Sequence, residues 1–205
     1  MIVILYLYDN AIVENLRDSF HTTEDGKPVV CVVPPEDIIS IAAQVQDDII
    51  RFPLIAVARE TNIPIDNELN NFTRRHQGVA TTFDNVKNEI YYEKAIPLKL
   101  TYNLVCMATN TADVDELLRE LLFKYSSQYF LNITVPYESK RKIRFGINVN
   151  PNEEIEWYST TSNYLQEGKL HSAGIHLYVE GAVYLHYTPQ KLRRLDYEIE
   201  PTVHK

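Results

Sequence analysis

The residues from Ala95 to Val149 contain the two clearest hydrophobic patterns of the chain. Apolar residues alternate with polar ones from Ile96 to Cys106, which is the period of a strand with one buried face. The period then changes to that of an amphipathic helix. Its apolar positions fall at i, i+3, i+4, i+7, i+8 and i+11: Val114, Leu117, Leu118, Leu121, Leu122 and Tyr125.

The start of this helix carries the residues that a helix N-terminus favours. Asn110 and Thr111 are capping residues, and Asp113, Asp115 and Glu116 complement the positive end of the helix dipole. A returning strand follows, with its apolar residues at alternate positions: Ile143, Phe145, Ile147 and Val149. The stretch therefore predicts a helix packed on a sheet.

Weaker patterns on either side predict the remaining elements. We expect strands at Ile2 to Tyr8, at Leu54 to Ala58 and at Gly174 to Tyr187, and a second helix from Pro35 to Ile49. Gly181, inside the last strand, is expected to mark a bulge or a close approach of another group. The predicted fold class is α+β: a mostly antiparallel or mixed sheet with two main amphipathic helices packed on it.

We expect one domain over residues 1–205, because 205 residues suffice for a single core and no linker divides them. Residues 61–88 are polar and irregular in apolar spacing, which predicts an extended loop or arm. Residues 190–205 are predicted to be a charged C-terminal tail.

Composition limits the class of protein. Twenty Lys and Arg against 28 Asp and Glu give a formal charge of -8, which argues against nucleic-acid binding through bulk charge. Cys31 and Cys106 lie in apolar runs, so they are expected to be buried thiols, not a disulfide. The apolar N-terminus is too short for a membrane span and lacks the features of a signal peptide, so no membrane partner is expected.

The motifs of common enzymes are missing from the sequence. It has no glycine-rich phosphate loop, no G-x-S-x-G turn and no metal-ligand spacing among its six histidines. His176 and His186 fall on the polar face of the last predicted strand and are expected to face solvent. We therefore expect no catalytic, cofactor-binding or metal-binding residues, and no enzyme activity. The alternative is a small-ligand enzyme with its site in the loop at 61–88.

Charged clusters are the remaining candidates for function. The basic ones are Arg74, Arg75 and His76, then Lys140, Arg141, Lys142 and Arg144, then Lys191, Arg193 and Arg194. Together with Asp113, Asp115 and Glu116 on the predicted helix, they predict contacts between protein chains, where opposite charges fix the register. An ordinary solvated surface and contact with nucleic acid are the alternatives.

These residues also carry a family resemblance. The segments IPLKLTYNL, ADVDELLRELLFKY and VPYESKRKIRFGINV, followed by LHSAGIHLYVEGAVYLHY, resemble the tail terminator or sheath-stabiliser proteins of contractile-tailed bacteriophages. The similarity runs from Arg51 to Glu198 and includes FPLIAVARE and FTRRH. It lies in pattern and order, and the first fifty residues do not take part in it.

The resemblance implies a non-enzymatic virion protein, assembled in the bacterial host cytoplasm. Members form a six-fold ring that caps the tail tube, anchors the last sheath ring and joins the neck. The implied partners are other copies of the chain, the tube and sheath proteins and neck or connector proteins, with passive contact to DNA in the lumen. A different neck protein, such as a stopper or head-completion protein, is the alternative within this class.

Overall fold

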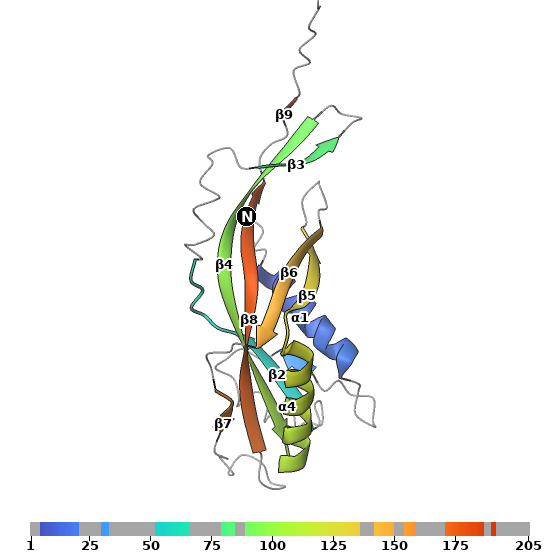
Figure 1. The fold of residues 1–205 in the computed structure, drawn as a ribbon, viewed down its shortest axis with the longest axis vertical. Helices are drawn as coiled ribbons and strands as arrows, with labels where there is room; N and C mark the ends of the chain where they lie inside the picture. Colours follow the sequence, from blue (N-terminus) through green and yellow to red (C-terminus); the bar gives the residue numbers. More distant parts are fainter. Residues whose placement is uncertain are drawn as a thin grey trace, which may run out of the picture.

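The computed structural model describes residues 5–20, 30–32, 52–65, 79–84, 89–135, 142–149, 154–158, 171–186 and 190–191. Two helices are present there, α1 (Leu5–Ser19) and α4 (Thr111–Tyr125) (Figure 1). The strands are β1 (Val30–Val32), β2 (Leu54–Arg59), β3 (Val79–Asp84), β4 (Glu89–Ala108), β5 (Tyr129–Thr134), β6 (Lys142–Val149), β7 (Glu156–Tyr158), β8 (His171–His186) and β9 (Gln190–Lys191). The mostly antiparallel sheet with two helices confirms the predicted α+β class.

The sheet is built around the long antiparallel pair of β4 and β8, which stay in register from Glu93–His186 to Ala108–His171. The strand order is β1-β2-β4-β8-β6-β5, and only β1 and β2 pair in parallel among the described strands. β3 and β9 pair with the first residues of β4, and β7 pairs with the first residues of β8. Figure 1 shows that β3 and β9 extend the sheet beyond both helices.

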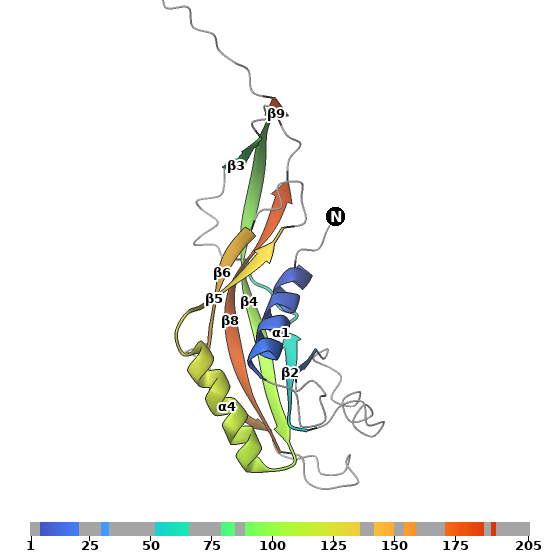
Figure 2. The same ribbon diagram turned by 90° about the vertical axis from the view of Figure 1, so that its right-hand side faces the viewer.

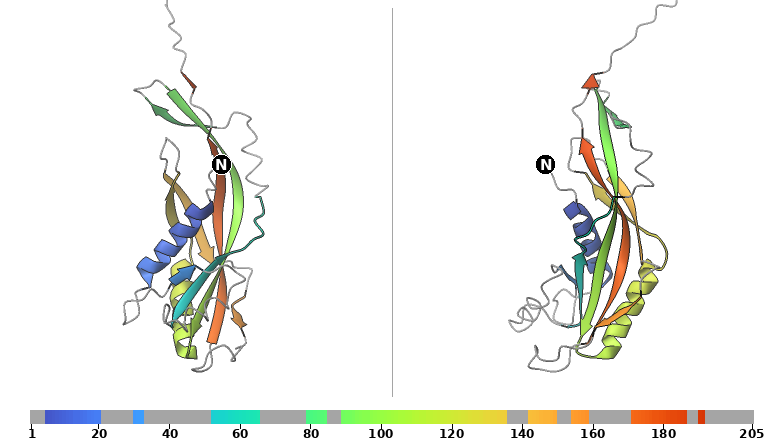
Figure 3. Two further views of the ribbon diagram at one scale, coloured as in Figure 1. Left: turned by 180° about the vertical axis from the view of Figure 1, so that it is seen from behind. Right: turned by 90° about the vertical axis from the view of Figure 1, so that its left-hand side faces the viewer.

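The sheet is strongly curved, and the two helices cover it differently (Figures 2 and 3). α4 packs on the central strands β4, β8 and β6. α1 contacts β1 and β5, the two outermost strands of the main strand order. The first helix therefore lies across the opening between the two edges of the curved sheet.

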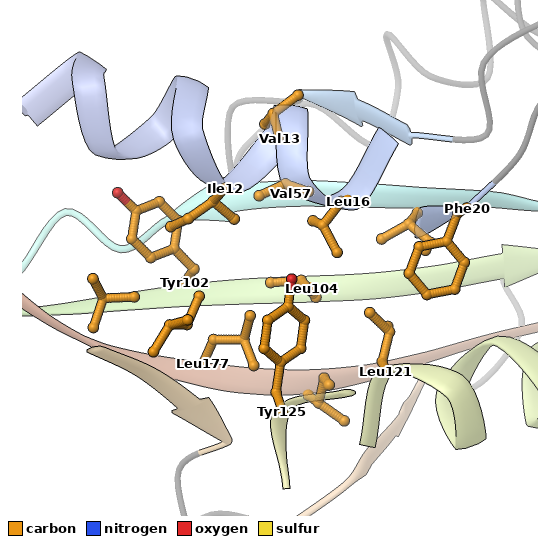
Figure 4. Close-up of a cluster of buried hydrophobic side chains, with 14 of the residues drawn as sticks. Ile12, Val13, Leu16, Phe20, Val57, Tyr102, Leu104, Leu121, Tyr125 and Leu177 are labelled. Atoms are coloured by element: carbon orange, nitrogen blue, oxygen red, sulfur yellow. The ribbon is translucent and has the colours of Figure 1, made fainter. Parts of the chain in front are cut away.

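One hydrophobic cluster fills the space between the helices and the sheet. Alternation in β4 is confirmed where the helices cover it, because Leu100, Tyr102, Leu104 and Cys106 are all at most 1% exposed. Beyond that cover Ile96 is 38% exposed. Figure 4 shows side chains meeting from each layer: Ile12 and Leu16 of α1, Tyr125 of α4 and Leu104 of β4.

The predicted helix at 111–125 is confirmed as α4, together with its cap. The Asn110 side-chain oxygen accepts hydrogen bonds from the backbone N–H groups of Ala112, at 2.6 Å, and Asp113, at 3.3 Å. These bonds satisfy two of the N–H groups that every helix N-terminus leaves without a partner in the helix. Val114, Leu118, Leu121 and the other predicted apolar positions face the core, although Leu122 is only partly buried.

The prediction of a strand over Ile2 to Tyr8 is wrong from Leu5 onward, where α1 begins. The N-terminal residues Ile2 to Tyr8 form an uninterrupted apolar run, which does not by itself distinguish a strand from a helix. A helical spacing dominates over the longer stretch, because Tyr8, Ile12, Val13 and Leu16 fall at i, i+4, i+5 and i+8 and are all buried. Packing of this face against the curved sheet overrides the high strand propensity of the aromatic and aliphatic residues at its start.

Polar side chains join α1 to the sheet at two points. Arg59 of β2 donates from Nη1 to both carboxylate oxygens of Asp9, at 2.8 and 2.9 Å, and the Tyr102 hydroxyl donates to Asp9 Oδ1 at 2.7 Å. The Tyr8 hydroxyl accepts a hydrogen bond from the Ala182 N–H at 2.9 Å. Burial raises the pKa of both tyrosines, so both hydroxyls keep their protons at neutral pH.

Gly181 confirms the predicted close approach. A Cβ atom added there would lie 2.7 Å from Cδ1 of Leu100, which is fully buried.

The strands predicted at Leu54 to Ala58 and Gly174 to Tyr187 appear as β2 and β8. Within the arm predicted at 61–88 the structure describes residues 61–65 and β3, a strand that the sequence did not predict. The helix predicted from Pro35 to Ile49 and residues 192–205 lie outside the described residues.

Candidate interaction surfaces

The outward side of α4 combines acidic residues with an exposed aromatic ring. Glu116, Arg119, Glu120 and Phe123 fall at i, i+3, i+4 and i+7, which places them in one row along the helix. All four are exposed, and Phe123, at 78%, is the most exposed of the large hydrophobic side chains that the structure describes. Arg119 pairs weakly with Glu116 at 3.4 Å. We call this row the α4 outer face.

The last turn of α4 is tied to α1. The Lys124 amine donates to the Asn15 carbonyl oxygen at 3.0 Å and to the Ser19 hydroxyl, and the Tyr125 hydroxyl donates to Asn15 Oδ1 at 2.9 Å. Burial lowers the pKa of Lys124 and raises that of Tyr125. The inner side of α4 packs on β4, β8 and β6, and its last turn is tied to α1, whereas the α4 outer face is exposed.

A second surface lies on β5 and β6, on the side of the sheet that faces away from the core. The Arg144 guanidinium lies over the Phe130 ring, 4.0 Å from its centroid, and Phe130 is 42% exposed. Lys142 is also exposed and lies opposite Thr134, while Asn132 lies opposite Arg144. We call this surface, with Phe130, Asn132, Thr134, Lys142 and Arg144, the β5–β6 outer face.

The two surfaces lie apart along the long direction of the molecule. α4 has 15 residues, about 22 Å at 1.5 Å per residue, and β5 adds six residues, about 20 Å. Figure 1 shows that strands β5 and β6 continue beyond the C-terminal end of α4. The acidic start of the helix therefore lies far from Lys142 and Arg144 within the same chain.

The structure describes six of the charged residues predicted to form an interface, and three of them lie on the two named surfaces: Glu116, Lys142 and Arg144. Asp115 and Glu116 are exposed on α4, and Asp113 is partly buried beside the cap. Lys142 and Arg144 lie on β6. Lys191 lies in β9. The other predicted interface residues lie outside the described part of the chain: Arg74, Arg75, His76, Lys140, Arg141, Arg193 and Arg194.

Phe123 and Phe130 were not singled out from the sequence. Phe123 falls off the apolar face of its helix, and an aromatic residue among charged ones is the signal that marks it. Phe130 lies in β5, whose sequence YFLNIT is rich in aromatic and branched residues, but β5 itself was not predicted.

The expectation that His176 faces solvent is wrong. Its side chain is only 13% exposed and lies on the far side of the sheet from the core, opposite Asn103 of β4. Its Nδ1 atom is 3.2 Å from Glu60 Oε1, and its Nε2 atom is 3.9 Å from Glu156 Oε1. The imidazole therefore joins β8 to β7 and to the segment after β2, and these neighbours exclude water from a position that alternation alone marks as exposed.

Cys106 agrees with its prediction. It is a free thiol, fully buried, and burial raises its pKa to about 12, so it remains protonated and inert at neutral pH. Within the described ranges, no three His, Cys, Asp or Glu side chains gather closely enough to hold a metal ion. No helix in the described ranges is long and apolar enough to cross a membrane.

Comparison with models of known protein families gives no match to this chain, and comparison with curated protein sequences gives none either.

Proposed function

We propose that this chain is the subunit of a ring that terminates and stabilises a contractile phage tail. It caps the tail tube, anchors the last sheath ring and joins the neck, and it acts as a structural virion protein with no catalytic step. The sequence resemblance over Arg51 to Glu198 supports the proposal.

The observation that carries the proposal is the pairing of two unlike exposed surfaces. The α4 outer face is acidic and ends in Phe123, and the β5–β6 outer face is basic and contains Phe130. Exposed aromatic rings beside charged residues are typical of protein interfaces. Two different surfaces on one subunit suit a head-to-tail contact, which closes into a ring when the rotation between neighbours divides a full turn.

The test is the mass and shape of the purified chain. A six-fold ring has a mass of about 143 kDa, six times the 23.8 kDa of the subunit. We expect native mass measurement to give this value and class-averaged micrographs to show six-fold rings with a central opening. A chain that stays monomeric, even when mixed with the tube and sheath subunits of the same particle, contradicts the proposal.

A further inference from the structure

We infer that the α4 outer face of one subunit binds the β5–β6 outer face of the next copy, with Phe123 as the central apolar contact. The inference deepens the proposed function and rests on it, because it names the contact that would build the ring. The partner is a second copy of this chain.

Charge complementarity selects this partner. The α4 outer face presents the carboxylates of Glu116 and Glu120, with Arg119 between them and paired with Glu116, and the β5–β6 outer face presents the cations of Lys142 and Arg144. On a chain with a net charge of -8, an exposed basic pair is attracted to another acidic protein surface, and the chain itself supplies one.

The spacing of the charges also agrees. Glu116 and Glu120 are four residues apart on a helix, a rise of about 6 Å. Lys142 and Arg144 are two residues apart on a strand, about 6.6 Å. Both members of each pair lie on one side of their element, so two ion pairs form at once when the helix lies along the strand.

The two phenylalanine rings favour the contact in different ways: Phe130 orients a charged side chain, and Phe123 supplies apolar surface to bury. Stacking on Phe130 holds the Arg144 guanidinium in one orientation before the partner arrives, so less side-chain freedom is lost on binding. Phe123 is exposed by 78% in the single subunit, and burial of its ring against the partner removes that apolar surface from water.

The contact requires two copies. Because α4 and β5 follow one another along the molecule, Glu116 cannot reach Lys142 or Arg144 of its own subunit (Figure 1). A contact between two different surfaces is heterologous, so each subunit offers one free surface of each kind to the next until the ring closes.

The experiment uses two charge-reversal variants of the full chain, each with a different mass tag. The acid-face variant carries Glu116→Lys and Glu120→Lys, and the base-face variant carries Lys142→Glu and Arg144→Glu. Each variant alone brings like charges together, and we expect at least a hundredfold loss of assembly in native mass measurement. Circular dichroism of each variant checks that the subunit is folded.

Mixing the two variants is the decisive step. Opposite charges then meet only between unlike variants, so assembly is expected to return as rings with three copies of each, in alternation. The matched control is the variant Glu14→Lys with Glu154→Lys, which changes the net charge as the acid-face variant does, at exposed positions outside both surfaces. It is expected to assemble like the unchanged chain.

Phe123→Ala tests the apolar part of the contact. Assembly is expected to weaken at least tenfold, while Ile155→Ala, which also removes an exposed apolar side chain, leaves it unchanged. Unchanged rings in both charge variants, or folded variants that do not reassemble when mixed, overturn the inferred contact and leave the ring itself standing. An unchanged chain that forms no ring with or without tube and sheath subunits overturns the proposed function instead.

Discussion

The two faces of the β4–β8 strand pair are built from the same two stretches of chain, yet they differ in what surrounds them. On the covered face Tyr102, Leu104 and Leu177 are at most 1% exposed and pack against both helices. On the other face Asn103 and His176 lie opposite one another, beside Glu60 and Glu156. Apolar packing therefore stabilises one face, and contacts between polar side chains organise the other.

The difference implies that the two faces tolerate substitution unequally. A closely packed core loses stability when atoms are removed or added, whereas exposed side chains adjust with little loss. The following variants test that contrast by unfolding in urea at one fixed protein concentration, since self-association of any protein adds to its apparent stability.

Leu104→Ala is expected to have the largest effect, a loss of about 3 kcal/mol of unfolding free energy. Leu104 is fully buried between α1 and the sheet, so the substitution removes buried methyl groups and leaves a cavity. Thr101→Val, in the same strand but on the other face and partly exposed, keeps the branched shape and should change stability by less than about 1 kcal/mol. Equal effects at the two positions would show that the faces are not packed differently.

Gly181→Ala and Gly146→Ala form the second pair. At Gly181 the new methyl group meets the Leu100 side chain at 2.7 Å, inside the core, so we expect a loss of about 2 kcal/mol. At Gly146 the nearest atom is the side-chain amide of Gln128, an exposed residue that moves aside. That variant should remain within about 0.5 kcal/mol of the unchanged chain or gain slightly, because alanine limits the unfolded chain more than glycine does. The reverse ranking would contradict the assignment of the two glycines to different faces.

Tyr102→Phe is expected to lower stability by about 1 kcal/mol, the smallest of the three effects. It removes the hydrogen bond to Asp9, while Arg59 still holds the carboxylate through two bonds. Tyr129→Phe is the control, because Tyr129 lies at the exposed edge strand and its hydroxyl accepts only a long bond of 3.4 Å. If Tyr129→Phe lowers the unfolding free energy as much as Tyr102→Phe does, the hydrogen bond from Tyr102 to Asp9 is not a specific source of stability.

The same variant changes the response to alkaline pH. Burial raises the pKa of Tyr102, Tyr8 and Tyr125 in the folded state, whereas an unfolded tyrosine ionises near pH 10. The stability from keeping these groups protonated is complete below about pH 10 and is lost as the pH rises further, because the unfolded chain then releases protons that the folded chain holds. In Tyr102→Phe the fall of the urea midpoint above pH 10 should be shallower.

The elements that the sequence predicted well are those whose hydrophobic period is long and uninterrupted. The strand at 96–106 and the helix at 111–125 repeat their patterns over many residues, so tertiary packing follows the local preference there. α1 was missed because its first residues favour a strand, and only the spacing from Tyr8 to Leu16 shows the helix. β3 and β5 were missed because their residues do not alternate clearly between apolar and polar.

The candidate surfaces were predictable only in part. Charge clusters are visible in a sequence, so Asp115, Glu116, Lys142 and Arg144 are predicted as contact residues; all four are exposed, and the contact itself stays a prediction. Exposure of Phe123 and burial of His176 depend on which neighbours cover each position, and those neighbours come from distant parts of the chain.

The position of α1 across both edges of the sheet has a consequence for biosynthesis. The Tyr8 hydroxyl bonds to Ala182, 174 residues later, and α1 also contacts β5. At roughly 5–20 residues per second, a ribosome takes about 9–35 s to make the intervening chain. The earliest of the described helices must therefore wait, with its apolar face uncovered, for nearly the last strand. Contacts of such long range slow folding, so this chain is expected to complete its fold only after synthesis has almost ended.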